Sequence, residues 1–211
     1  MGKNKVIEKV KAKILENISE DGDSIEKKEI MLFGMTRIIE DIPKYIGIIL
    51  ICFTLGILRE LGIVFLVTAC YKTFVGGVHL KTNMGCFIGS IVYFQTCIYF
   101  PKLIELQYQD RLGIYGLLYI FAIYVILIYV PADVPEIPII NKRKRRRDRV
   151  FSFIILNVIY LIAMFLIKDN VYKDMIILTI FYLNIMTTRI IYRIFGNKYG
   201  YETYIPDELL T

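Results

Sequence analysis

Three long stretches without a charged side chain constrain this chain more than any other feature. They cover residues 82–101, 112–132 and 150–167. A helix needs roughly 20 predominantly apolar residues to cross the hydrocarbon core of a bilayer. A soluble domain of 211 residues would not need such runs, nor the 56% of hydrophobic residues that accompany them. The pattern therefore predicts an all-α polytopic membrane protein.

The apolar segments predict about six transmembrane helices, with four as the smallest number that fits. The first two segments are short and are separated by Arg59 and Glu60, so tilted helices and a re-entrant hairpin both fit them. Pro101 is expected to stop the third helix, and prolines at positions 131, 135 and 138 predict an extended connector. The predicted spans are residues 45–58, 61–71, 82–100, 112–130, 150–167 and 175–188.

The ends of the chain are expected to lie outside the membrane core. Residues 3–20 carry Ile and Val at helical spacing among Lys and Glu, which is typical of an amphipathic surface helix. We therefore predict amphipathic cytoplasmic or interfacial helices over residues 1–41, a transmembrane domain over 42–195 and a cytoplasmic tail over 196–211.

A basic cluster predicts how the chain is oriented. Residues 142–149 hold seven basic side chains and one acid, Asp148. Basic loops stay on the cytoplasmic side of a membrane, because moving them across is costly. This predicts a multi-pass protein with both termini in the cytoplasm and lipid headgroups as partners. The net charge of +6 is thereby explained without a nucleic-acid partner.

The chain has one histidine, His79, which follows Gly76 and Gly77 and precedes Cys86 by seven residues. A cysteine and a histidine are the minimum for catalysis by a thiol nucleophile. On one continuous helix, however, seven residues would separate them by about 10 Å along the axis. Proton transfer needs roughly 3 Å. Catalysis therefore requires a break in the helix, which the glycines and a cap at Thr82 or Asn83 would supply.

Such a cap would place Cys86 in the first turn of a new helix. There the helix dipole favours a thiolate, and free N–H groups could donate to a developing oxyanion. The competing interpretation is a histidine at a helix interface and an inert buried cysteine.

The other polar residues of the spans indicate packing. Asn157 and Asn184 predict hydrogen bonds between helices. Cys52, Cys70 and Cys97 are expected to pack as small apolar residues. No cysteine spacing suggests a disulfide framework or a zinc site, so we predict no metal and no cofactor.

The segment Gly76-Gly77-Val78-His79, followed by Cys86, resembles the signature of the accessory gene regulator B (AgrB) family. These proteins are integral membrane cysteine endopeptidases that process quorum-sensing propeptides. The segment 130–133, Val-Pro-Ala-Asp, and the basic stretch after it resemble that family's Ala-Pro-acidic element and its Lys/Arg-rich loop. The resemblance covers essentially the whole chain.

This resemblance implies that Cys86 is the nucleophile and His79 its base, while Gly76 and Gly77 shape the approach to the substrate. Lys72 stands near the position of a family arginine; it keeps the charge without the bidentate fork. The resemblance also implies a bacterial cell membrane, an AgrD-like propeptide substrate and a homodimer. A cysteine or serine of the peptide would take the acyl group from the enzyme thiol, giving a thiolactone or a lactone.

The sequence does not single out the residue that orients the histidine or the role of the basic cluster. Asp133, Glu136, Gln95 and Ser90 are candidates to orient the histidine; depth and charge favour Asp133, and distance along the helix disfavours Gln95. The basic cluster either recruits an acidic segment of the propeptide or serves topology and lipid contact. Its candidate residues are Lys142, Arg143, Lys144, Arg145, Arg146 and Arg147.

Two other classes of function fit the same residues. One is a peptide transporter or membrane scaffold in which His79 lines a cavity. The other is a membrane acyltransferase that uses Cys86.

Overall fold

The computed structural model describes residues 25–80, 82–135 and 138–204. The chain divides into two compact units, residues 1–51 and residues 52–211. The amphipathic helix predicted over residues 3–20 lies outside the described residues, and so does Glu136.

The first unit contains most of α2, which runs from Ile25 to Thr54. The sequence had suggested an interfacial segment ending near residue 41 and a separate span from residue 45. In the structure one helix passes through both segments, with Pro43 inside it. One proline removes one backbone hydrogen bond, which a 30-residue helix can lose without ending. Lys44 Nζ also lies 2.6 Å from Asp41 Oδ1 across the proline.

The second unit is built from helices, and no β-strand occurs among its described residues. By length and composition, three helical stretches can cross a membrane, namely Met84–Leu103, Tyr108–Tyr129 and Lys142–Leu166. The chain is therefore a helical membrane protein, which confirms the predicted class. The elements are α3 (Leu58–Val75), α4 (Asn83–Leu103), α5 (Tyr108–Tyr129), α6 (Lys142–Leu161), the π-helical turn η1 (Ile162–Leu166), α7 (Asn170–Ile185), α8 (Arg189–Ile194) and α9 (Gly200–Tyr204).

Several helix ends differ from the sequence prediction. Helix α4 continues through Pro101 to Leu103, and α6 begins inside the basic cluster at Lys142. The Asn141 side chain caps α6 by accepting the N–H groups of Arg143 and Lys144 at 2.9 and 3.3 Å. Apolar composition therefore located the part of each helix that suits a bilayer, whereas capping sets where the helix begins.

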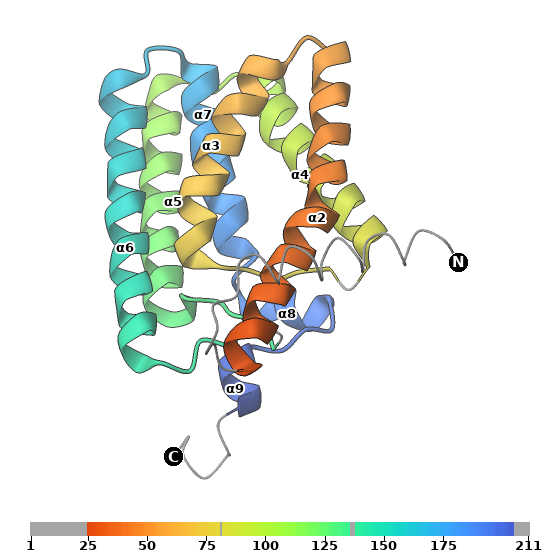
Figure 1. The fold of residues 1–211 in the computed structure, drawn as a ribbon. Coiled ribbons are helices and arrows are strands. Elements are labelled where there is room, and N and C mark those ends of the chain that lie inside the picture. The colour runs from red at the N-terminus through yellow and green to blue at the C-terminus, as the bar shows by residue number, and fades with distance from the viewer. Residues whose placement is uncertain (1–24, 81, 136–137, 205–211) are drawn as a thin grey trace. The chain divides into compact units, whose positions relative to one another are not determined.

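Helices α3 and α7 lie in the middle of the second unit, with α4 on one side and α5 and α6 on the other (Figure 1). Their contact buries a core that includes Tyr71, Val75 and Ile177. Two predicted hydrogen bonds between helices are confirmed. The Tyr71 hydroxyl donates to Asn184 Oδ1 at 3.2 Å, and the Tyr119 hydroxyl donates to Asn157 Oδ1 at 2.7 Å.

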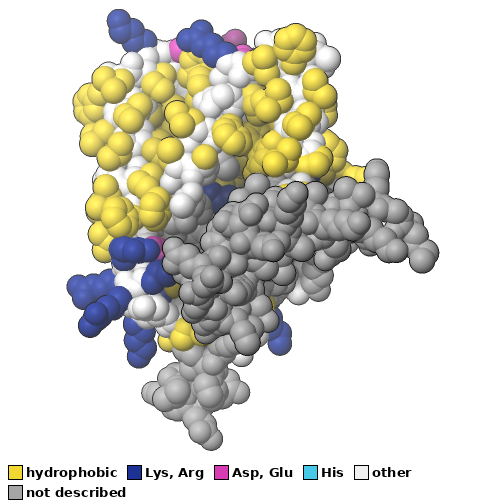
Figure 2. All heavy atoms as spheres, viewed as in Figure 1, with side chains coloured by type: hydrophobic (Ala, Val, Ile, Leu, Met, Phe, Trp, Pro, Cys, Tyr) yellow, Lys and Arg dark blue, Asp and Glu magenta, His cyan; other side chains and the backbone are white. Residues whose placement is uncertain are grey.

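Large apolar side chains cover the outside of the helices. Figure 2 shows hydrophobic side chains along the flanks of the helices, with Lys and Arg side chains collected toward the ends. Leu117 and Phe165, for example, are 69% and 80% exposed. Such a surface suits lipid as its solvent. Cys52 and Cys97 are buried as predicted, but Cys70 is exposed on α3 and does not pack in the core.

One end of the second unit is held by ion pairs. Helices α3, α5 and α7 start there, and α4 ends there. Arg111 Nε lies 3.1 Å from Asp174 Oδ1, and the side chains are only 11% and 12% exposed. The Tyr115 hydroxyl also donates to Asp174. Lys102 and Glu60 form a second pair at 2.7 Å, which joins α4 to α3.

We expect Asp174→Ala to lower the free energy of unfolding in detergent by about 3 kcal/mol, because Arg111 would remain largely buried without its partner. Replacing both residues with apolar side chains should cost less than the single change. Glu202→Ala is the control, since it breaks an exposed pair with Arg189 and should cost under about 1 kcal/mol. Equal losses for Asp174→Ala and Glu202→Ala would contradict this account.

Candidate functional site

The helix interruption predicted around His79 is present. Helix α3 ends at Val75, residues 76–80 are not helical, and α4 begins at Asn83. Thr82 is the cap: its Oγ1 accepts the N–H of Gly85 at 3.1 Å, and its carbonyl accepts the N–H of Cys86 at 2.9 Å. Cys86 therefore lies in the first turn of a new helix, as the sequence suggested.

The interruption depends on a close approach of two backbones. The N–H of Gly77 donates to the Ala132 carbonyl at 3.0 Å, and the N–H of Ala132 donates to the Val75 carbonyl at 2.9 Å. A Cβ atom on Gly76 would lie 2.2 Å from the Ala132 carbonyl oxygen. Gly76 also has φ of 80°, a conformation that side chains disfavour. Glycine is therefore required where these two segments meet.

The segment after α7 holds the next two residues. The N–H of Val78 donates to the Met186 carbonyl at 3.0 Å, and Asn197 Nδ2 donates to the His79 carbonyl at 2.5 Å. The Val78 side chain is buried with Ala132 and two tyrosines of the C-terminal segment. We call residues 76–79, 130–133 and 186–199 together the glycine junction.

Sequence reasoning missed Asn197 entirely. It follows Gly196, whose φ of 64° ends α8 in a tight turn, and its own N–H donates to the Tyr192 carbonyl at 2.8 Å. A glycine–asparagine pair signals such a turn. Nothing local signals that the amide will reach a carbonyl 118 residues away in the sequence.

The two reactive side chains lie on either side of the cap. His79 is exposed, and Cys86 is a half-buried free cysteine. A thiol at a helix N-terminus and an imidazole on the preceding link supply the groups that acyl transfer requires. Thr82 takes up the N–H groups of Gly85 and Cys86, so any oxyanion donor in this turn lies earlier, at Met84 for example.

The side chain of Asp133 faces the basic helix. It is 1% exposed, and its Oδ2 accepts the N–H of Ile139 at 2.8 Å and Arg145 Nη1 at 3.3 Å. Its Oδ1 is buried without a hydrogen-bond partner. The peptide carbonyl of Asp133 accepts the Tyr192 hydroxyl at 3.1 Å. Asp133 thus ties the connector after α5 to both α6 and α8.

The basic cluster falls into two groups. Arg145 and Arg149 are half-buried and donate to the Pro131 and Val130 carbonyls at 3.3 and 3.0 Å. Arg145 also stacks on the ring of Tyr201. The remaining cations of residues 142–147 are exposed, including Lys142, Arg143, Lys144, Arg146 and Arg147. Two arginines therefore hold the connector while five cations face outward.

The remaining candidates from the sequence, Lys72, Gln95 and Ser90, lie on helices α3 and α4. Lys72 is exposed in the last turn of α3, and its carbonyl accepts the N–H of Gly76 at 2.9 Å. Gln95 lies farther along α4, with its amide nitrogen 3.9 Å from the sulfur of Cys52. Ser90 is half-buried on the same helix. Within the part of the chain that the structure describes, no three His, Cys, Asp or Glu residues are grouped as a metal site would require.

Comparison with known proteins gives a family match over most of the chain. The family model described as Accessory gene regulator B matches residues 4–189. An AgrB-like protein of Clostridium beijerinckii is 25% identical over 125 residues, which is 58% of this chain and 61% of that protein. The aligned part therefore spans less than two thirds of that relative's length. No solved structure matches the chain.

We expect Gly76→Ala to destabilise the second unit by more than about 1–2 kcal/mol, the usual cost of a left-handed conformation for a residue with a Cβ. The added carbon would also overlap the Ala132 carbonyl. Gly113→Ala is the matched control, because nothing lies within 4 Å of a Cβ at that helical position. Thermal unfolding in detergent should show a lower midpoint for Gly76→Ala only. Equal midpoints would refute the close approach at the glycine junction.

Proposed function

Because the chain belongs to the accessory gene regulator B family, whose members take part in quorum-sensing peptide processing, we propose that it is a membrane-embedded cysteine endopeptidase. Its substrate would be an AgrD-like propeptide, cleaved in its C-terminal part. The observation that carries this proposal is the helix interruption, which places Cys86 in the first turn of α4 and His79 on the link before it.

In the proposed reaction, His79 takes the proton of the Cys86 thiol, and the thiolate attacks the scissile carbonyl carbon. The tetrahedral intermediate collapses when the leaving amine receives that proton from His79. This leaves the N-terminal part of the peptide as a thioester on Cys86. A cysteine or serine of the peptide then gives its proton to His79 and attacks the thioester carbonyl. The bond to the Cys86 sulfur breaks, His79 returns the proton to that sulfur, and a thiolactone or lactone ring closes.

The glycine junction would serve this reaction by fixing the backbone on which His79 stands. Within the junction, the N–H of Val78 donates to the Met186 carbonyl, and the His79 carbonyl accepts a hydrogen bond from Asn197 Nδ2. A general base must be held within hydrogen-bond reach of the proton that it removes. His79 is an exposed residue.

We further propose a multi-pass topology with both termini in the cytoplasm. The glycine junction brings together the ends of α3, α5 and α7, and α6 begins beside it through the bond of Arg149 to the Val130 carbonyl. The exposed cations of residues 142–147 therefore lie at the same end as Cys86. Lipid-bilayer energetics keep such a cluster in the cytoplasm, where the propeptide is made. From the family resemblance, we also propose the surrounding lipids and a second copy of the chain as partners.

The five exposed cations are suited to an acidic segment of the propeptide. They surround the start of α6, whereas Arg145 and Arg149 are engaged with the connector. Asp133 accordingly has the role of holding Arg145 in our proposal, and it would affect the substrate only through that contact.

We expect Cys86→Ala to abolish cleavage of a co-expressed propeptide, because it removes the nucleophile. His79→Ala should slow cleavage by about 10²–10⁴-fold, the usual contribution of a general base. Cys70→Ala is the control, since it removes an exposed thiol on α3. Cleavage is followed on a gel, and hydroxylamine should release a peptide adduct from wild-type and Cys70→Ala protein but not from Cys86→Ala protein. Full cleavage by Cys86→Ala would favour a transporter or scaffold.

Neutralising Lys142, Arg143 and Lys144 to Gln together should raise KM for an acidic-tailed propeptide roughly tenfold, at about 0.5 kcal/mol for each exposed contact. The value of kcat should not change, and added salt should shrink the difference. Arg145→Gln is the contrasting variant, because it should lower the unfolding midpoint by freeing Asp133. Recruitment by these cations is wrong if KM stays the same while topology is kept.

A further inference from the structure

The leucine that follows His79 packs on the helix that carries Cys86. A Cβ atom built on Gly89 would lie 2.9 Å from Leu80 Cδ1, and one built on Gly85 would lie 3.8 Å from Leu80 Cβ. Carbon atoms in ordinary contact are about 3.5–4.0 Å apart. Leu80 therefore occupies space that any side chain at position 89 would have to share.

This contact joins the two sides of the helix cap. Leu80 belongs to the link before α4, whereas Gly85 and Gly89 are four residues apart on one face of α4. Cys86 lies between those glycines in the sequence, in the first turn. Leu80 thus ties the residue next to the candidate base to the helix surface beside the candidate nucleophile.

A second contact holds the peptide group of His79 itself. Asn197 Nδ2 donates to the His79 carbonyl at 2.5 Å, and the N–H of Asn197 donates to the Tyr192 carbonyl at 2.8 Å. Asn197 lies beyond residue 189, where the family match ends, so that match does not account for it.

The segment that carries Asn197 is fixed to the rest of the second unit. Tyr199 is buried, and its ring stacks on that of Tyr192 with the two centroids 4.3 Å apart. A Cβ atom on Gly200 would lie 2.3 Å from the Val134 carbonyl oxygen, so the backbones of this segment and of the connector after α5 are in contact. Asn197 therefore extends from a rigid support, as a group that positions another residue must.

We propose that Leu80 and Asn197 are positioning residues for the proposed reaction, an assignment that depends on Cys86 as its nucleophile and His79 as its base. The two contacts hold His79 at a fixed place relative to Cys86 while the imidazole takes the thiol proton and gives it to the leaving amine. Both transfers need heavy atoms within about 3 Å of each other. Neither positioning residue has to contact the peptide, so the effect falls on kcat and not on KM.

The first test changes the fit between Leu80 and position 89. Gly89→Ala puts a methyl group 2.9 Å from Leu80 Cδ1, so Leu80 must move by about 1 Å to reach an ordinary contact. The kcat for propeptide cleavage should fall about 10–100-fold, with KM unchanged. The unfolding midpoint should not fall, because alanine favours a helix more than glycine does. A merely structural role for this contact would lower the midpoint instead.

Leu80→Val in the Gly89→Ala background removes one methylene group where one methyl group was added. This double variant should recover most of the lost kcat, because the total volume at the contact is restored. Wild-type kcat in Gly89→Ala, or a loss that Leu80→Val leaves unchanged, would overturn the role of Leu80.

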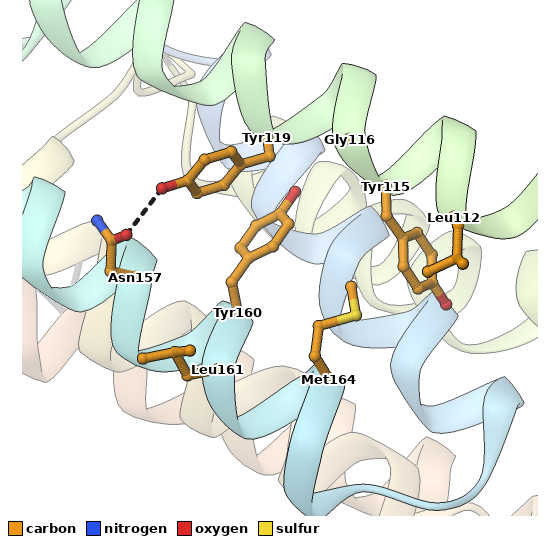
Figure 3. A pocket seen from close by; sticks show the side chains of 8 residues that line it. All are labelled: Leu112, Tyr115, Gly116, Tyr119, Asn157, Tyr160, Leu161 and Met164. Atoms are coloured by element: carbon orange, nitrogen blue, oxygen red, sulfur yellow. Dashed lines mark hydrogen bonds between the residues drawn. The ribbon is translucent and has the colours of Figure 1, made fainter.

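Gly116→Ala is the matched control for Gly89→Ala. Figure 3 shows Gly116 on α5, beside an open depression between α5 and the α6–η1 helix. Nothing lies within 4 Å of a Cβ atom built on this glycine. The same substitution in a helix should therefore leave kcat at the wild-type value here.

The second test removes the hydrogen bond to the His79 carbonyl. Asn197→Asp keeps the size of the side chain, but an ionised carboxylate cannot donate. The kcat should fall about tenfold with KM unchanged, which corresponds to one lost hydrogen bond. Asn170→Asp is the control, because it makes the same change at an exposed position at the other end of the unit. Equal kcat for these two variants would overturn the role of Asn197.

Cys86→Ala in the same assay separates the positioning roles from the proposed function. Equal cleavage by wild-type and Cys86→Ala protein would overturn the proposed function and the positioning roles with it. Cleavage that requires Cys86 but keeps its kcat in both Gly89→Ala and Asn197→Asp would overturn the positioning roles alone.

Discussion

The close approach of Gly76 to Ala132 is the contact on which the second unit is organised. Glycine at position 76 permits this approach, because a Cβ there would overlap the Ala132 carbonyl. Helix α3 ends at Val75, and the chain after it pairs with the connector after α5. The chain can then start a new helix under its own cap at Thr82. Cys86 consequently lies near a helix N-terminus. In an uninterrupted helix it would lie in the interior, away from the positive end of the helix dipole.

The two ends of the unit are joined by different chemistry. Backbone hydrogen bonds and glycines join the helices at the glycine junction, while Arg111–Asp174 and Lys102–Glu60 join them at the other end. Helices in lipid gain little from apolar contact with one another, since lipid tails are equally apolar. Polar links at both ends, with Tyr71–Asn184 and Tyr119–Asn157 between them, therefore carry much of the specificity of packing.

The sequence correctly predicted the features that depend on residues close together in the chain. Uncharged runs located the apolar helices, a cap was expected at Thr82 or Asn83 and is Thr82, and the asparagines within spans bond between helices as predicted. The prediction that Pro101 stops its helix is wrong, because Pro101 lies inside α4, as Pro43 lies inside α2. A proline removes one backbone hydrogen bond and strains one turn. The remaining hydrogen bonds of a long helix can offset that cost in free energy. The basic cluster also contains two kinds of residue that the sequence does not distinguish. Arg145 and Arg149 are half-buried and hold the connector, whereas the other cations are exposed.

The amino-acid sequence alone was enough to establish a helical membrane protein with a break before Cys86, because length, charge and capping act over a few residues. Only the folded chain assigns the partners at that break. Ala132, Met186 and Asn197 come from three later segments, and each supplies one backbone or amide group to residues 77–79. Any carbonyl or N–H group could in principle fill these positions, so the choice among them depends on how α3, α5 and α7 pack together.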